Sequence, residues 1–195
     1  MTIPTSSTMS DISKFTISVP DQGLSDLKQR LSLAKFPDEL ENAGWDMGAP
    51  LGDVQRLARY WQNNFDWKKS ENNINKLPQF KTSIQCEGFE PLGIHFIHSR
   101  SKANDAIPLL FCHGWPGSFF EGLKLLKPLT ESTDGQPSFH VVIPSLPNYG
   151  FSEGTSKRGF GNAQYAETLH KLMLKLGYDE YLTQGGEFLR RLSGL

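Results

Sequence analysis

The segment best suited to chemistry is the hexapeptide HGWPGS at residues 113–118, which directly follows an apolar run. Gly114 and Gly117 let the backbone turn sharply and approach a ligand closely, and Pro116 fixes the turn and removes one N–H donor. The remaining N–H groups can point at a developing negative charge, as an oxyanion hole requires. The same pattern also suits a simple strand-to-helix turn with a space-filling Trp115, and chemistry alone leaves the two interpretations equal.

Other residue patterns exclude several kinds of site. The chain has no Gly-x-Ser-x-Gly sequence, which disfavours a serine esterase, and it has no HxxEH, CxxC or GxGxxG sequence. Cys86 and Cys112 lie far apart, so we expect buried free thiols rather than a disulfide or a zinc site. Four histidines have no carboxylate or nucleophile at motif spacing and are expected at the surface or on a sheet face. These are His95, His98, His140 and His170.

The elements that must position segment 113–118 begin with predicted strands. Residues 80–86 and 94–98 alternate apolar and polar side chains around a turn at 87–89, which predicts a hairpin. Residues 107–112 and 139–143 are continuous apolar runs, as expected of strands buried on both faces.

Helical spacing separates the later strands. Apolar residues recur at helical intervals over 117–129 and again from Ala163 to Leu176, where Gly177 is expected to cap the helix. A further strand begins at 181–183. The alternation predicts an α/β fold with a largely parallel sheet that opens with an antiparallel hairpin and uses helices as crossovers.

The first 78 residues predict a helical arm with little sheet of its own. A short strand is expected at 15–19, and Asp21 is a candidate N-cap for the first helix. Helices are predicted over 22–34, 52–64 and 70–76. The predicted divisions are a flexible N-terminus at 1–13, the arm at 14–78, an α/β core at 79–187 and a divergent tail at 188–195.

Bulk properties exclude further classes of protein. The 195 residues are 37% hydrophobic and 21% charged, with a formal net charge of −1, so the chain lacks the basic surplus of a nucleic-acid binder. The N-terminus has no apolar stretch of signal-peptide length, and the longest apolar run, 107–112, is too short for a membrane span. We therefore expect a soluble, cytoplasmic protein.

Several motifs, in order along the chain, resemble the microsomal-type branch of the α/β-hydrolase-fold epoxide hydrolases. Segment 113–118 resembles the oxyanion loop of that family. The resemblance runs from about residue 13 to residue 187, with Lys68 where Arg is more usual and Asn148 where Gly is common. The other matching segments are Trp61, 65–68, 77–80, 144–152 and 181–186.

The resemblance implies hydrolysis of a small hydrophobic epoxide to a vicinal diol, through a carboxylate nucleophile and an ester intermediate, without a metal or an organic cofactor. It also implies that the backbone N–H groups of Trp115 and Phe188 form the oxyanion hole. His113 could be a catalytic base, but the base of this family comes late in the chain. We therefore expect His113, with Gly114 and Pro116, to support the oxyanion loop.

The resemblance places Glu187 at the position of the family's Asp nucleophile. Glu is one methylene longer than Asp, and misplacement of about 1 Å can cost on the order of 100-fold in rate. Leu189 stands where the family usually has Gly, in a tight strand-to-helix turn. The family's cap, acid and base lie further along than Leu195, so we expect an inactive, truncated form with its cap and C-terminal half missing.

Two other hypotheses remain open. The chain could be a non-catalytic fragment that pairs with a partner or a homologue, or forms homo-oligomers or aggregates, through the open edge of a strand at 180–184. Alternatively, Glu187 could retain residual catalysis with a different base, although loss of a base and its orienting acid costs orders of magnitude.

Overall fold

The computed structural model describes residues 11–131 and 135–186. The chain forms two compact units. One consists of residues up to Thr16 together with those from Leu77 onward, and the other of Ile17–Lys76. The first is here called the core unit and the second the arm. Most of the predicted flexible N-terminus, the predicted tail, and the site residues Glu187 and Phe188 lie outside the described residues.

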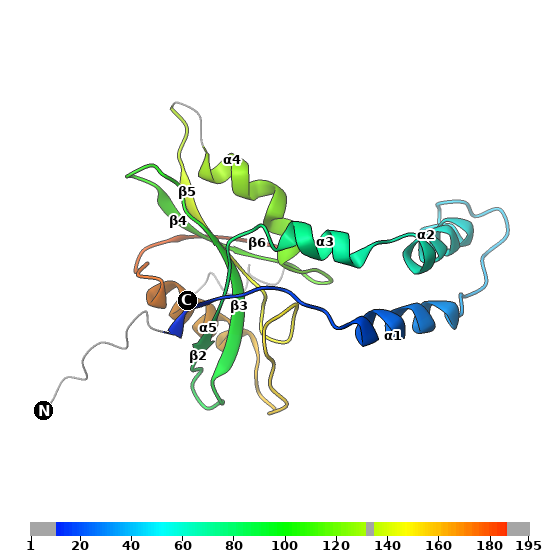
Figure 1. The fold of residues 1–195 in the computed structure, drawn as a ribbon, viewed down its shortest axis with the longest axis horizontal. Helices are drawn as coiled ribbons and strands as arrows, with labels where there is room; N and C mark the ends of the chain where they lie inside the picture. The colour runs from blue at the N-terminus through cyan, green and yellow to red at the C-terminus, as the bar shows by residue number, and fades with distance from the viewer. Residues whose placement is uncertain (1–10, 132–134, 187–195) are drawn as a thin grey trace, which may run out of the picture. The chain divides into compact units, whose positions relative to one another are not determined.

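The core unit is built on a six-stranded sheet in the order β1-β2-β3-β5-β4-β6 (Figure 1). Strands β1, β2, β3 and β5 are joined by antiparallel pairings, whereas β4 is parallel to both β5 and β6. The prediction of an antiparallel hairpin followed by parallel strands is therefore confirmed. The strands are β1 (Ser13–Lys14), β2 (Gln79–Ile84), β3 (Leu92–Ser99), β4 (Ile107–Cys112), β5 (Phe139–Pro144) and β6 (Leu182–Gly185).

Helices cover both faces of this sheet. On one face, α5 (Asn162–Lys175) buries Leu172 and Met173 in a cluster with Phe96 of β3 and Val142 of β5. The preceding residue of β3, His95, points to the other face, where its ring packs on that of Phe119 at a centroid distance of 5.1 Å. Alternation of side chains along the strands thus divides the core into two layers.

The prediction of a single helix over 117–129 is wrong, because two helices of different type occupy this range. The structure has a 3₁₀ helix, η2 (Phe119–Leu125), followed by a short α-helix, α4 (Leu126–Thr130). Gly122 of η2 lies against the sheet so closely that a Cβ atom there would be 2.6 Å from Ile143 Cδ1. The apolar spacing did not reveal this close approach.

The arm contains three helices, α1 (Asp21–Ser32), α2 (Leu51–Asn63) and α3 (Trp67–Ile74). The first two match their predictions, but neither contains a buried residue. The third begins earlier than predicted because the Asp66 side chain caps it, accepting a hydrogen bond from Lys69 N at 3.0 Å. The predicted cap at Asp21 is wrong, since Asp21 lies inside the helix and Pro20 occupies the N-cap position without a side-chain hydrogen bond.

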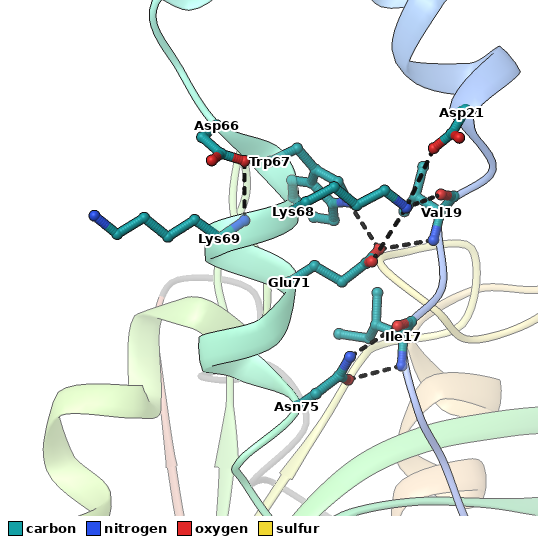
Figure 2. A network of polar contacts seen from close by, with 9 residues as sticks. All are labelled: Ile17, Val19, Asp21, Asp66, Trp67, Lys68, Lys69, Glu71 and Asn75. Atoms are coloured by element: carbon teal, nitrogen blue, oxygen red, sulfur yellow. Dashed lines mark hydrogen bonds and ion pairs between the residues drawn. The ribbon is translucent and has the colours of Figure 1, made fainter.

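The predicted strand at 15–19 is also wrong. Strand β1 ends at Lys14, and although Phe15 N still donates to Gln79 O of β2 at 2.9 Å, the backbone of residues 17 and 19 bonds to side chains from α3 and the residue after it. Asn75 accepts from Ile17 N and donates to Ile17 O, both at 2.8 Å. Glu71 accepts from Val19 N at 2.7 Å and from Trp67 Nε1 at 2.9 Å. Figure 2 shows these contacts along one side of α3. The segment is thus held in an extended form by a polar network within the arm.

Candidate functional site

Two loops lie together beyond the carboxyl ends of the three parallel strands, β5, β4 and β6. Segment 113–118 follows β4, and segment 144–152 contains the end of β5 and the loop after it. Cys112 of β4 pairs in register with Gly185 of β6, so the chain leaves both strands at neighbouring points. Open α/β sheets bind ligands at this edge.

His113 is a buried link between the two loops. Its Nε2 atom lies 3.2 Å from Leu146 N, whose N–H donates to it. The ring proton must then be on Nδ1, which lies 3.0 Å from Gly114 O and donates to that carbonyl. Both ring nitrogens are therefore engaged by backbone groups, which leaves no nitrogen to accept a proton from a substrate or from water.

The same hydrogen bond sets the direction of the Trp115 N–H. The Gly114 carbonyl and the Trp115 N–H belong to one trans peptide plane, because the cis bond of the loop lies after Trp115, so they point in opposite directions. No described residue accepts a hydrogen bond from the Trp115 N–H, and the Trp115 side chain is 76% exposed. Among the described residues the loop thus holds a donor of set direction without an acceptor, as the predicted oxyanion hole requires.

Glu121 of η2 is a contact of this loop that the sequence motifs did not indicate. Its Oε2 atom accepts a hydrogen bond from Gly114 N at 3.1 Å. The motif drew attention to the two glycines, but nothing in the spacing identified the carboxylate that lies against them.

His95 is a second residue that the sequence motifs did not indicate. This buried residue of β3 lies 2.9 Å from Ser145 Oγ through Nδ1 and 3.1 Å from Gln79 Oε1 through Nε2. Burial lowers the pKa of His95 to about 4, with a smaller contribution from the Lys81 charge. His95, on β3, and His113, in the loop after β4, therefore hold the adjacent residues Ser145 and Leu146.

The remaining histidines lie away from this edge. His98 Nε2 is 2.9 Å from the Tyr178 hydroxyl, and His140 Nδ1 accepts from Ser101 N at 3.1 Å. His170 is exposed on α5. Burial is the largest cause that lowers the pKa of His98, to about 4. None of the three contacts the loop at 113–118.

Cys86 and Cys112 are buried free thiols, as predicted, and burial raises the pKa of both. Across residues 11–131 and 135–186, no group of three or more His, Cys, Asp or Glu side chains is arranged to hold a metal ion. Within the same ranges, no helix has both the length and the apolar character needed to cross a bilayer.

The structure brings together the sequence-predicted residues His113, Gly114, Trp115 and Pro116 in one loop. The other two predicted residues, Glu187 and Phe188, lie outside the described part of the chain, which ends one residue after β6. Their roles remain predictions.

Comparisons with known proteins agree with this architecture. Residues 12–122 match the family described as "Epoxide hydrolase N terminus", and residues 107–186 match "alpha/beta hydrolase fold". The chain is 38% identical over 185 residues to Epoxide hydrolase 1 of Sus scrofa, an alignment that covers 91% of this chain and 40% of that protein.

Two solved structures are also similar. The epoxide hydrolase of Aspergillus niger has a TM-score of 0.78 and 36% identity, over 92% of this chain and 47% of that one. The juvenile hormone epoxide hydrolase of the silkworm Bombyx mori has a TM-score of 0.79 and 31% identity, over 91% and 47%. The chain thus spans less than half the length of these relatives. With its N-terminal match extending over more than half of its residues, the chain belongs to the epoxide hydrolase family.

Proposed function

We propose that the chain supplies the oxyanion side of a site that hydrolyses a small hydrophobic epoxide to a vicinal diol. The observation that supports this most is the Trp115 N–H, which no described residue accepts and whose direction is set by the His113 hydrogen bond on the same peptide plane. The pairing of Cys112 with Gly185 adds support, because it brings the end of β6 beside that loop. Family membership supports an epoxide as the substrate class.

The proposed chemistry needs no metal or organic cofactor. A carboxylate at position 187 attacks an epoxide carbon, the epoxide C–O bond breaks, and the freed oxygen takes up a proton as an ester forms. Water then adds to the ester carbonyl and releases one proton to solvent, which balances the proton taken up by the epoxide oxygen, and the tetrahedral oxyanion accepts hydrogen bonds from the N–H groups of Trp115 and Phe188. Collapse of that intermediate releases the diol and restores the carboxylate, which in the family is an Asp at this position. His113, Gly114 and Pro116 support the loop.

We further propose that the 195-residue chain alone is inactive. Glu187 carries one methylene more than the family's Asp, and Leu189 replaces a residue that is usually Gly in a tight turn. We expect both changes to displace the nucleophile from the position that the family's Asp takes. A cytoplasmic location likewise remains a prediction from the sequence.

Turnover of styrene oxide tests the inactivity. We expect the wild-type chain and Glu187→Gln to form diol at the same rate as buffer alone, measured by chromatography. A wild-type rate well above that of Glu187→Gln would contradict inactivity and would make Glu187 a working nucleophile.

Restoring the family's residues at positions 187 and 189 tests the site itself. In the double variant Glu187→Asp with Leu189→Gly, the carboxylate regains the family geometry, and we expect one covalent styrene oxide adduct per chain by mass spectrometry. The matched control, Glu187→Asn with Leu189→Gly, should form none at position 187. Absence of the adduct from the Asp-containing variant would contradict the proposed site.

The exposed edge of β6 supports a second candidate function, pairing with a second copy or with a longer homologue. Among the described strands β6 pairs only with β4, and Leu182 on it is 52% exposed. An unpaired edge with an apolar side chain is a template for strand addition. Such a chain would act as a non-catalytic partner rather than as an enzyme.

Light scattering after size-exclusion chromatography tests this pairing. We expect the wild-type mass to rise with concentration and the variant Thr183→Pro, which removes an N–H group from β6, to stay monomeric. Glu180→Pro, just before the strand, is the matched control for the proline itself. A wild-type monomer at every concentration would contradict edge pairing.

A further inference from the structure

The carboxylate of Glu121 spans the turn that carries the Trp115 N–H. One of its oxygens accepts from Gly114 N at 3.1 Å. The other occupies the space beside Gly117, where an added Cβ atom would collide with Glu121 Oε1 and lie 3.0 Å from Gly114 O. Glu121 therefore contacts both glycines of the HGWPGS segment, and Gly117 has no room for a side chain while that carboxylate is in place.

Glu121 and His113 fix the two sides of Gly114. His113 holds the Gly114 carbonyl, and Glu121 holds the Gly114 N–H. With both backbone groups tied, rotation of the peptide that contains the Trp115 N–H would break at least one hydrogen bond. The donor direction is thus set in advance rather than at the moment an anion binds.

The negative charge of Glu121 opposes the binding of an anion at the loop that its hydrogen bond holds in place. None of the ion pairs among the described residues involves Glu121. An unpaired carboxylate near the loop repels the negative charge that the loop is suited to bind. Geometry and charge therefore have opposite effects on anion binding, and substitutions can separate them.

We propose that Glu121 is a positioning residue of the oxyanion loop, which fixes the Trp115 N–H by holding Gly114 and opposes anion binding through its charge. The effect of the Glu121 charge on anion binding rests on the proposed function, whereas the positioning of Gly114 does not. Gln at this position keeps an acceptor oxygen and removes the charge, whereas Ala removes both.

Amide hydrogen exchange of the 195-residue chain, followed by NMR, tests the positioning. We expect Gly114 N–H to exchange about tenfold faster in Glu121→Ala, since it loses its acceptor, and to stay close to wild type in Glu121→Gln. Gly117→Ala should speed the same exchange with Glu121 intact, because its Cβ displaces the carboxylate. Glu131→Ala, an exposed carboxylate on the C-terminal side of α4, is the control. Unchanged Gly114 exchange in both Glu121→Ala and Gly117→Ala would overturn the positioning.

Acetate serves as the anion probe for the charge effect. We expect acetate to shift the Trp115 amide resonance with about threefold tighter binding in Glu121→Gln than in wild type, as removal of one nearby charge predicts. Equal affinity in the two chains would overturn the charge effect. If acetate shifts the Trp115 amide in neither chain, the oxyanion function fails and the charge effect with it. The Gly114 exchange result still decides the positioning independently.

Discussion

The core unit and the arm are stabilised by different kinds of contact. Strand β3 of the core buries Ile94, Phe96 and Ile97 completely between helices on two faces. In the arm, α1 and α2 bury no residue, although α2 carries apolar side chains such as Leu57 along one side. The arm's best-defined contacts are polar, from Glu71 and Asn75 of α3 to the extended segment before α1. A helical apolar pattern therefore predicts helices in both regions but not their burial, because α1 and α2 bury no residue whereas α3 buries Ile74.

Deletion of a core side chain should produce the largest difference between the regions. Phe96→Ala removes a fully buried ring and should lower the free energy of unfolding by about 3–5 kcal/mol. Leu57→Ala, on a side chain 56% exposed, should cost less than about 1 kcal/mol. Urea denaturation of both variants measures the difference. Equal losses would show that the arm has an apolar core of its own.

Acid should weaken the core through His95. Its pKa is about 4 in the folded chain against an ordinary 6.5, so the unfolded chain binds more protons between these values. Stability should therefore fall as the pH drops from 6.5 towards 4, with His95 contributing up to about 3 kcal/mol. His95→Gln should be less stable at pH 7 but should show a shallower decline in urea denaturation at pH 7 and 4.5. His170→Gln, at an exposed histidine, is the control and should lose stability with falling pH as wild type does. If His95→Gln lost stability between pH 7 and 4.5 as steeply as wild type, this prediction would be contradicted.

The arm should respond to loss of the Glu71 network. Glu71→Ala leaves the N–H groups of Val19 and Trp67 without their acceptor, and we expect protease cleavage within the arm to become roughly tenfold faster. Asp53→Ala, which removes a half-exposed carboxylate on α2, is the matched control. Cleavage at the wild-type rate in Glu71→Ala would show that polar contacts do not hold this segment.

The pH dependence of the arm should differ from that of the core. Hydrogen bonds, first from Val19 N–H and then from Trp67 and Lys68, hold the pKa of Glu71 below its ordinary 4.5, although burial opposes them. Its contribution is complete above pH 4.5 and is lost as the pH falls further. Protease cleavage of the arm should therefore accelerate only below pH 4.5, whereas the core weakens from pH 6.5. Acceleration of arm cleavage already at pH 6 would contradict this separation.

Surface charge should matter least. The pair of Arg56 and Asp53 on α2 is largely exposed at 3.1 Å, so Arg56→Ala should change the free energy of unfolding by less than about 0.5 kcal/mol. A larger loss in urea denaturation would show that the arm depends on this pair.

Local patterns were sufficient for much of the fold. The hairpin, the two buried strands and the helix at α5 follow from alternation, apolar runs and helical spacing. The predicted strand at 15–19 failed because its partners, Asn75 and Glu71, lie more than 50 residues away and act through side chains. Propensity does not reveal partners at that separation.

The part of the candidate site that lies within one short segment was predictable, and the part that the fold brings together was not. HGWPGS was identifiable because its glycines and proline are adjacent in sequence. His95 was not, since its partner Ser145 lies 50 residues away. Glu121 was not predictable either, because its contact with the loop depends on the space beside Gly117, which only the structure shows.

Titration of the wild-type chain with acetate, followed at every backbone amide, tests the proposed oxyanion loop most directly. We expect a saturable shift of the Trp115 amide in the core unit, with the Leu57 amide of the arm unchanged. A Trp115 amide that shifts no more than that of Leu57 would contradict the claim that this loop is an oxyanion donor.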